Sequence, residues 1–184
     1  MTTTKKIIVR LACATVLGTA GAALTQVNRP QTAVVNAATT SVAARALGVD
    51  VASYQNADLS SHAQAGAQFA IVKVSEGTSY RNPKASSQIS TALSNNMMPM
   101  AYHFATFSSN ASAAAAEANY AIQTAQAFGL PKGSYIACDY ETGSGNNIYG
   151  GKTPTANAII AFMDTIKNAG YKPLLYASSS VLQN

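Results

Sequence analysis

Histidine, cysteine and acidic residues are scarce in this sequence, and each shortage narrows the chemistry open to it. Among 184 residues there are two His, two Cys, seven Asp and Glu together, and no Trp. A metal site needs several clustered ligands, whereas His62 and His103 are far apart and no His-x-x-x-His spacing occurs. The sequence therefore predicts neither a bound metal nor any other cofactor.

Once the N-terminal segment is removed, the chain keeps a single cysteine and cannot form an intramolecular disulfide. Cys13 lies in that segment, and Cys138 lies in an apolar run further along the chain. A lone buried thiol usually behaves as a small hydrophobic side chain. No His adjoins Cys138 in the sequence, so a catalytic cysteine is not expected.

The first forty residues have the layout of a secretory signal peptide. A basic start precedes the apolar stretch "LACATVLGTAGAAL" (11–24), and "VVNAA" (34–38) offers an Ala-x-Ala-like cleavage signal. We expect cleavage after Ala37, with residues 1–37 as the signal peptide. Cleavage near Ala23 and retention as an uncleaved anchor are the alternatives, although the apolar run is short for a membrane span.

Removal of the signal peptide changes the charge balance of the protein. Four of the 12 basic residues precede the cleavage site, which leaves eight against seven acidic residues. A mature chain near +1 gives no reason to expect nucleic acid as a partner. We expect a secreted, monomeric protein with no stable membrane association after cleavage.

The remainder of the chain alternates apolar runs with helix-like segments. The predicted strands are 46–52, 69–77, 99–105, 134–141 and 172–178, and the predicted helices are 57–67, 83–96, 110–128 and 155–169. Thr153 is the expected cap of the last helix, with Pro154 at its first position. This alternation is typical of α/β proteins with a parallel sheet, either an open doubly wound sheet or a (β/α) barrel.

Acidic residues at the ends of several predicted strands favour the barrel. Asp50 ends the first strand, Glu76 the second, and Asp139 with Glu141 the fourth. Active sites of (β/α) barrels form around this rim, whereas open sheets bind ligands at one switch point. A TIM-like (β/α) barrel is therefore the predicted fold class.

Asp139 and Glu141 form a pair on one side of the predicted strand "SYIACDYE". Side chains two positions apart share a face, so Cys138 and Tyr140 point to the other face, toward the helices. Two adjacent carboxyl groups suit glycoside hydrolysis, in which one acid protonates the leaving oxygen. Their repulsion raises the pKa of one group, which can then stay protonated near neutral pH. The alternative is a pair of ordinary strand-end residues that face water.

Other chemistries fit the sequence less well. "ETGSGNN" (141–147) lacks the third Gly of a nucleotide-binding loop, and we expect it to be a flexible loop over the site. No G-x-S-x-G nucleophile elbow is present. His103, within "AYHFA", is expected to be a hydrogen-bonded residue of the barrel rather than a ligand.

Five segments match, in order, the strand motifs of one known family. They are "GVDVASYQ" (48–55), "FAIVKVSEGTSYRNP" (69–83), "MAYHFA" (100–105), "ACDYET" (137–142) and "AGYKPLLYAS" (169–178). Together they resemble glycoside hydrolase family 25, the Chalaropsis-type lysozymes or N-acetylmuramidases. Each motif is weak alone, but five in sequence over residues 46–184 make a specific pattern.

The resemblance implies a barrel enzyme that cleaves the β-1,4 bond between N-acetylmuramic acid and N-acetylglucosamine in the peptidoglycan of bacterial cell walls. It implies that Glu141 is the proton donor and that Asp139 is the nucleophile or orients a participating substrate acetamide. Asp50 would be a further active-site acid. The groove-lining residues that it implies are Tyr54, Gln55, Glu76, Tyr102 and Phe104.

Two local features depart from a simple version of this pattern. The family often has Asp-Pro where this chain has Asn82-Pro83, which we expect to remove one acid near the rim. If Glu76 faces the barrel interior, strand alternation turns Lys73 outward, so the second strand needs a β-bulge or another assignment.

The matched region ends just after the fifth strand motif. The resemblance therefore implies about five of eight strand–helix units: a short linker (38–45) and a catalytic domain over 46–184 that is truncated at its C-terminus. The alternative is a truncated or degenerate remnant that binds glycan without cleaving it. A metal-dependent sugar deacetylase is disfavoured because the required histidine pair is missing.

Overall fold

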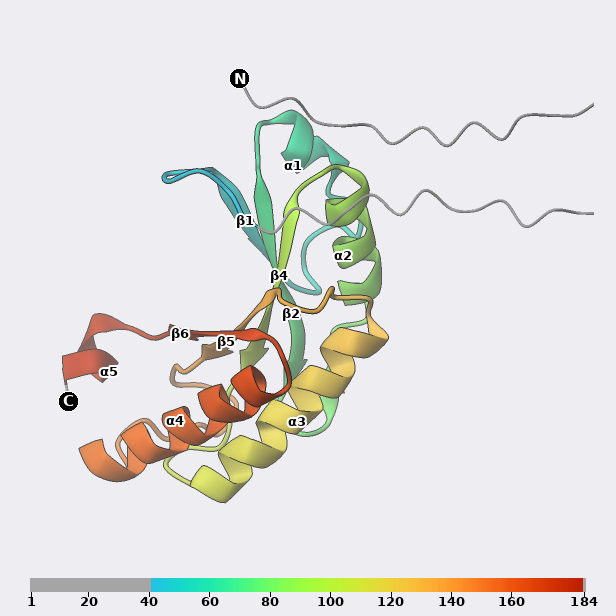
Figure 1. The fold of residues 1–184 in the computed structure, drawn as a ribbon. Helices are drawn as coiled ribbons and strands as arrows, with labels where there is room; N and C mark the ends of the chain where they lie inside the picture. Colours follow the sequence, from blue (N-terminus) through green and yellow to red (C-terminus); the bar gives the residue numbers. More distant parts are fainter. Residues whose placement is uncertain (1–40, 184) are drawn as a thin grey trace, which may run out of the picture. The chain divides into compact units, whose positions relative to one another are not determined.

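A parallel β-sheet is the centre of the structure, a computed structural model that describes residues 41–183. The predicted signal peptide, residues 1–37, lies outside the described residues. The sheet has the order β1-β2-β4-β5-β6, all parallel, with β3 antiparallel to β2 (Figure 1). The strands are β1 Gly48–Val51, β2 Phe69–Glu76, β3 Tyr80–Arg81, β4 Met98–Phe104, β5 Tyr135–Asp139 and β6 Lys172–Tyr176.

Helices follow the parallel strands, as the sequence predicts. They are α1 Ser60–Gln64, α2 Ala85–Ser94, α3 Ala111–Ala127, α4 Lys152–Asn168 and α5 Ser179–Gln183. The five predicted strands and four predicted helices are all present. The short elements β3 and α5 were not predicted.

Local sequence explains how the two long helices start. The Ala-rich α3 has high intrinsic helix propensity, and the Asn110 side chain caps it by accepting a 3.0 Å bond from the Ala113 N–H. The predicted cap of α4, Thr153, is wrong by two residues. Its N-cap is Gly151 at φ 94°, so Pro154 lies inside the first turn, where its missing N–H still costs no helical hydrogen bond.

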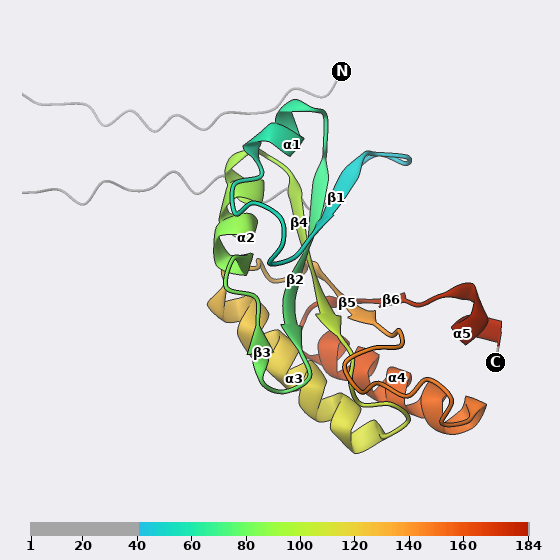
Figure 2. The ribbon, with the colours of Figure 1, turned by 180° about the vertical axis from the view of Figure 1, so that it is seen from behind.

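The two faces of the sheet have different surroundings. Helices α2, α3 and α4 pack against one face (Figures 1 and 2). Residues of the inner strands on that face are fully buried, among them Val72 and Val74 of β2 and Ile136 of β5. On β4, His103 faces the helices, and the alternate residues Tyr102 and Phe104 face the other way and stay partly exposed. The hydrophobic core therefore lies between the sheet and the helices.

The parallel strands lie side by side in the sheet in the same order as they occur along the chain. This confirms the α/β class and the parallel sheet. Among the described residues, β1 and β6 each pair on one side only, so these strands form an open parallel sheet, and the predicted incomplete TIM-like barrel is not confirmed. No helix within residues 41–183 is long and apolar enough to cross a lipid bilayer.

Candidate active site

Four of the predicted acids lie at one edge of the sheet. Asp50 lies in β1, Glu76 is the last residue of β2, Asp139 is the last residue of β5, and Glu141 follows two positions later. The carboxyl ends of parallel strands meet at the same edge, which brings these segments together. The strand register pairs Phe104 with both Glu76 and Asp139, so these side chains share the face opposite the helices.

A β-bulge in β2 sets the direction of Lys73 and Glu76. The register to β4 shifts between Lys73 and Ser75, so Val74 is an extra residue in the strand. Lys73 and Glu76 therefore face the same side, and the Lys73 Nζ lies 2.5 Å from the Glu76 carboxylate. Of the two alternatives that the sequence pattern left open, the bulge is confirmed.

A polar cleft of about 620 Å³ opens beside these residues. It is lined by Asp50, Ala52, Ser53, Tyr54, Gln55, Lys73, Glu76, Tyr80 and Tyr102. Four of the five predicted groove residues are among them, together with one predicted catalytic acid. The fifth, Phe104, does not line the cleft, but its ring centre lies 4.9 Å from the Lys73 Nζ.

Asp139 is the most strongly perturbed carboxyl group of the cluster. Its side chain is only 9% exposed. Burial, followed by the negative charge of Glu141, raises the pKa of Asp139 to about 7, although Lys73 opposes the shift. Its Oδ1 atom has no hydrogen-bond partner within residues 41–183. Glu141 is more exposed, at the rim of the sheet.

Asp50 and Tyr102 form a second polar unit at the cleft. Burial raises the pKa of Asp50, a hydrogen bond from the Tyr102 hydroxyl opposes this, and the charge of Glu141 adds to it. Burial and the charges of Asp50 and Asp139 raise the pKa of the Tyr102 hydroxyl, so it stays a hydrogen-bond donor. Electrostatic coupling therefore links the acids of β1 and β5.

Lys73 contributes a positive charge to the lining of the cleft. Its Nζ also lies 5.5 Å from the ring centre of Tyr80. Burial raises the pKa of Glu76, but the hydrogen bonds from Lys73 and Ser144 and the Lys73 charge outweigh it, so the pKa lies below its ordinary value. Sequence reasoning did not assign Lys73 and Tyr80 to the cleft. A lysine inside the apolar run "FAIVKV" was the available signal.

Asn82 does not face the cleft. Its side chain is fully buried and donates to the Lys73 carbonyl at 2.8 Å and to Gln88 of α2 at 3.1 Å. The expectation that this position removes an acid from the rim is therefore wrong. The amide is a hydrogen-bond donor beside the bulge, which an ionised carboxylate could not be.

The segment after Glu141 differs from the expected flexible loop. Asn146 is buried, with hydrogen bonds to the backbone of Glu141 and of Ser108, and Ser144 reaches Glu76. The sequence contained no signal for these contacts, because Ser108 belongs to a different connection of the sheet. The loop is anchored at its base and at its tip.

His103 and Cys138 lie on the helix side of the sheet, away from the cleft. His103 is fully buried between Ser75, at 2.8 Å, and Glu117 of α3, at 2.9 Å, which confirms a hydrogen-bonded role. Cys138 is a buried free thiol whose pKa is raised by burial. No group of three or more His, Cys, Asp or Glu within the described residues has the arrangement of a metal site.

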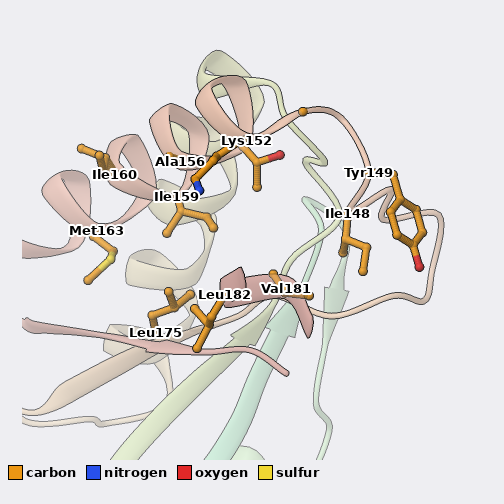
Figure 3. Close-up of a pocket in the computed structure, with 12 residues that line it drawn as sticks. Ile148, Tyr149, Lys152, Ala156, Ile159, Ile160, Met163, Leu175, Val181 and Leu182 are labelled. Carbon is orange, nitrogen blue, oxygen red and sulfur yellow. The ribbon is translucent and has the colours of Figure 1, made fainter. Parts of the chain in front are cut away.

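A second, apolar pocket of about 540 Å³ lies between α4, α5 and the preceding loop. Figure 3 shows Ile159, Met163, Leu175 and Leu182 converging on it. None of the predicted site residues lines this pocket, and it contains no carboxyl group. The acidic cleft is therefore the candidate active site.

Comparison with known proteins agrees with this geometry. The sequence profile described as glycosyl hydrolases family 25 matches residues 49–184. This chain belongs to that family. The segment matched by family 25 begins inside β1 and contains all the cleft acids.

Relatives of this family 25 chain include phage and bacterial proteins. A lysozyme of Lactococcus phage mv1 is 39% identical over 138 residues, which cover 74% of this chain and 67% of that protein. The Cpl-1 endolysin of phage Cp-1, solved with a peptidoglycan analogue, superposes with a TM-score of 0.60 at 30% identity, covering 73% of this chain and 37% of the endolysin. The bacterial lysozyme of Streptomyces coelicolor superposes with a TM-score of 0.61 at 26% identity, covering 77% of this chain and 67% of that lysozyme.

This chain is shorter than several of its relatives. It spans between 27% and 35% of the length of four further phage proteins that it matches.

Proposed function

We propose that this chain carries the catalytic acids of a lysozyme, an N-acetylmuramidase that hydrolyses the β-1,4 bond between N-acetylmuramic acid and N-acetylglucosamine in bacterial peptidoglycan. Membership in glycosyl hydrolases family 25 supports the reaction type. The similar phage protein named a lysozyme, and the similar endolysin solved with a peptidoglycan analogue, support the substrate.

The observation that carries the proposal is the Asp139–Glu141 pair at the end of β5, which does not line the cleft itself but lies at the same sheet edge as the cleft acids Asp50 and Glu76. Acid-catalysed glycoside hydrolysis needs one carboxyl group that holds a proton and a second that is ionised. The pKa of Asp139 is raised to about 7 by burial and by Glu141, so in the free chain the pair retains one proton through mildly acidic pH, held mainly by Asp139. An isolated strand-end carboxylate in water would not do this. With Glu141 as the donor, this proton must pass from Asp139 to Glu141 once the glycan is bound.

Position suggests the division of roles within the pair. Glu141 is partly exposed, so we assign it as the donor that protonates the leaving oxygen. Asp139 is nearly buried, and its Oδ1 atom has no hydrogen-bond partner within the described residues, so no protein contact fixes that oxygen. We assign it as nucleophile or as the group that orients the substrate acetamide. Asp50, held by Tyr102, would stabilise the developing positive charge.

The cleft provides surfaces suited to a glycan. Tyr54 is 93% exposed and Tyr80 also lines the cleft, so their rings are available to stack on sugar faces. Gln55 and Lys73 supply polar and charged contacts, and we propose that they, with Tyr102 and Glu76, bind the saccharide. Phe104 supports this wall through Lys73 rather than by direct contact.

The experiment that tests the proposal is release of reducing sugars from purified peptidoglycan by the Glu141→Gln variant. Turnover should fall by a factor on the order of 10² or more while the fold is retained, because general acid catalysis is lost. Asp164→Asn, on the exposed side of α4, is the matched control and should keep its activity. Near wild-type turnover of Glu141→Gln would refute the assignment, and glycan binding without hydrolysis by the unmodified chain would favour a non-catalytic role.

We also propose that the five parallel strands are consecutive strands of a TIM-like (β/α) barrel. The order without reversal and the helices on one face support this, because a doubly wound sheet reverses at a switch point. Hydrogen exchange tests it in the complete gene product. Slow exchange of alternate β1 amides that lack a β2 partner would support a further strand at that edge, and fast exchange would contradict it.

Export is a separate proposal, based on the predicted signal peptide. We propose removal of residues 1–37 and action of the mature monomer on the cell wall outside the producing cell. Mass spectrometry of secreted protein should find an N-terminus at about Ala38. An intact Met1 in the membrane fraction would instead identify an uncleaved anchor.

A further inference from the structure

Ser108, in the connection between β4 and α3, is tied to both sides of Glu141. Its N–H donates to the Asn146 Oδ1 at 2.8 Å, and its hydroxyl oxygen accepts from the Asn147 N–H at 2.9 Å. Its carbonyl accepts from the Tyr140 hydroxyl at 2.8 Å. Ser108 has φ 54°, a conformation that a residue other than Gly adopts only when its surroundings hold it there.

Asn146 completes this arrangement through both ends of its amide. The side chain is only 6% exposed. While its oxygen accepts from Ser108, its Nδ2 donates to the carbonyl of Glu141 at 2.8 Å. The Asn146 N–H also closes a tight turn by donating to the Gly143 carbonyl at 2.7 Å. Aspartate has the same shape but cannot donate to a carbonyl.

We propose that Asn146 is a positioning residue for Glu141: through Ser108, it fixes the backbone of the general acid to the β4–α3 connection. The proposal rests on the proposed function, in which Glu141 protonates the leaving oxygen. It assigns to the loop after β5 a role in setting the distance between the acid and the cleft.

The local backbone explains why such an anchor is needed. Glu141 lies beyond the last residue of β5, so the regular strand ladder does not hold it. The following turn contains Gly143, Ser144 and Gly145, all with positive φ, and offers little stiffness of its own. Displacement of a catalytic group by about 1 Å can cost on the order of 10²-fold in rate. The buried Asn146 amide restricts that displacement.

The decisive variant is Asn146→Asp in the full chain, with Asn147→Asp as the matched control. Both add one negative charge next to the same turn. Asn146→Asp loses the donor to Glu141, whereas the Asn147 side chain bonds only to the exposed Tyr149 N–H, which a carboxylate can also accept. Turnover of soluble peptidoglycan fragments should fall by about tenfold in Asn146→Asp with KM nearly unchanged, and should be retained in Asn147→Asp.

A double mutant separates positioning from general loss of structure. If Asn146 acts through Glu141, adding Asn146→Asp to Glu141→Gln should cause no further loss of turnover. A further tenfold loss in that background would overturn the proposal. Full turnover of Glu141→Gln alone would instead refute the general-acid assignment, so the two failures are distinguishable.

A readout independent of activity keeps the inference testable whatever the turnover. Hydrogen exchange in peptides covering 140–147 should be about tenfold faster in Asn146→Asp than in Asn147→Asp. Equal exchange would overturn the anchoring role. If Asn146→Asp fails to fold, Asn146→Ala takes its place, because it removes both amide contacts without adding a charge; it should also speed exchange in this segment, and unchanged exchange would contradict the inference.

Discussion

At the scale of the residue, Asp139 shows how position changes the chemistry of a common side chain. The carboxyl group ends a strand, is nearly buried, and lies near Glu141, Asp50 and Glu76. Burial and these like charges favour its protonated form, and Lys73 offsets them only in part. A site that costs stability in this way is typical of catalytic residues rather than of structural ones.

This raised pKa predicts how stability depends on pH. Between about pH 4 and pH 7 the folded protein keeps the Asp139 proton that the unfolded chain has released, so its contribution to the free energy of unfolding falls as pH rises through this window. Asp139→Asn removes the titrating group. Its stability relative to the unmodified protein should therefore increase from pH 4 to pH 7, as measured by urea denaturation.

The control for this measurement is Asp164→Asn, an exposed carboxyl group on α4. Its stability relative to the unmodified protein should change little with pH. If Asp139→Asn gave a difference that stayed constant from pH 4 to pH 8, the proton would not reside on Asp139, and the burial argument for this group would fail.

At the scale of the element, a buried network connects β2, β4 and α3. Ser75, just after the bulge, contacts the His103 Nδ1, and the His103 Nε2 contacts the Glu117 carboxylate. Glu117 also accepts from the N–H and the hydroxyl of Thr106, at 2.9 Å and 2.6 Å. The network holds the strand in the register that places Lys73 and Glu76 together on the cleft side.

Glu117→Gln tests this network. The amide cannot accept all three hydrogen bonds, so at least one buried donor is left without a partner, which costs about 1–3 kcal/mol of unfolding free energy. Chemical denaturation should show this loss. Gln123→Glu, the reverse change on the exposed side of the same helix, should alter stability by less than about 0.5 kcal/mol. Equal effects of the two variants would show that the network adds nothing to stability.

At the scale of the whole described chain, one hydrophobic core joins the sheet to its helices. Phe162 of α4 is fully buried and packs against His103, at a ring-centre distance of 5.4 Å, and against Phe107, at 6.0 Å. Its ring therefore connects the last long helix to both the central strand and the β4–α3 connection.

Phe162→Ala should lower the free energy of unfolding by about 3–5 kcal/mol, because it leaves a cavity at this junction. Since one core serves all the helices, helix content and tyrosine fluorescence should still change in a single coincident transition. Ile160→Ala, half-exposed on the same helix, should cost much less. Separate transitions for the two signals would indicate that α4 unfolds independently of the sheet.

The sequence by itself determined the order of the strands and helices along the chain, and the face of its strand to which each acidic side chain points. Short apolar runs predict β2, β4 and β5, and a period of two puts Asp139 with Glu141 and Cys138 with Tyr140. The same period left two alternatives for the segment from Lys73 to Glu76, a bulge or another strand assignment. These properties depend on neighbours within a few residues, so the local sequence is enough to predict them.

The tertiary structure alone decided which distant groups meet. Asn146 reaches Ser108, and Glu117 reaches His103, only because parallel strands bring the ends of separate connections to one edge. The pKa of Asp139 depends on burial, on the neighbouring Glu141, and on charged residues of β1 and β2, and of these only Glu141 is visible in the local sequence. The buried place of Asn82 was mispredicted because its partners, the Lys73 carbonyl and Gln88, belong to a strand and a helix that only the fold brings together around it.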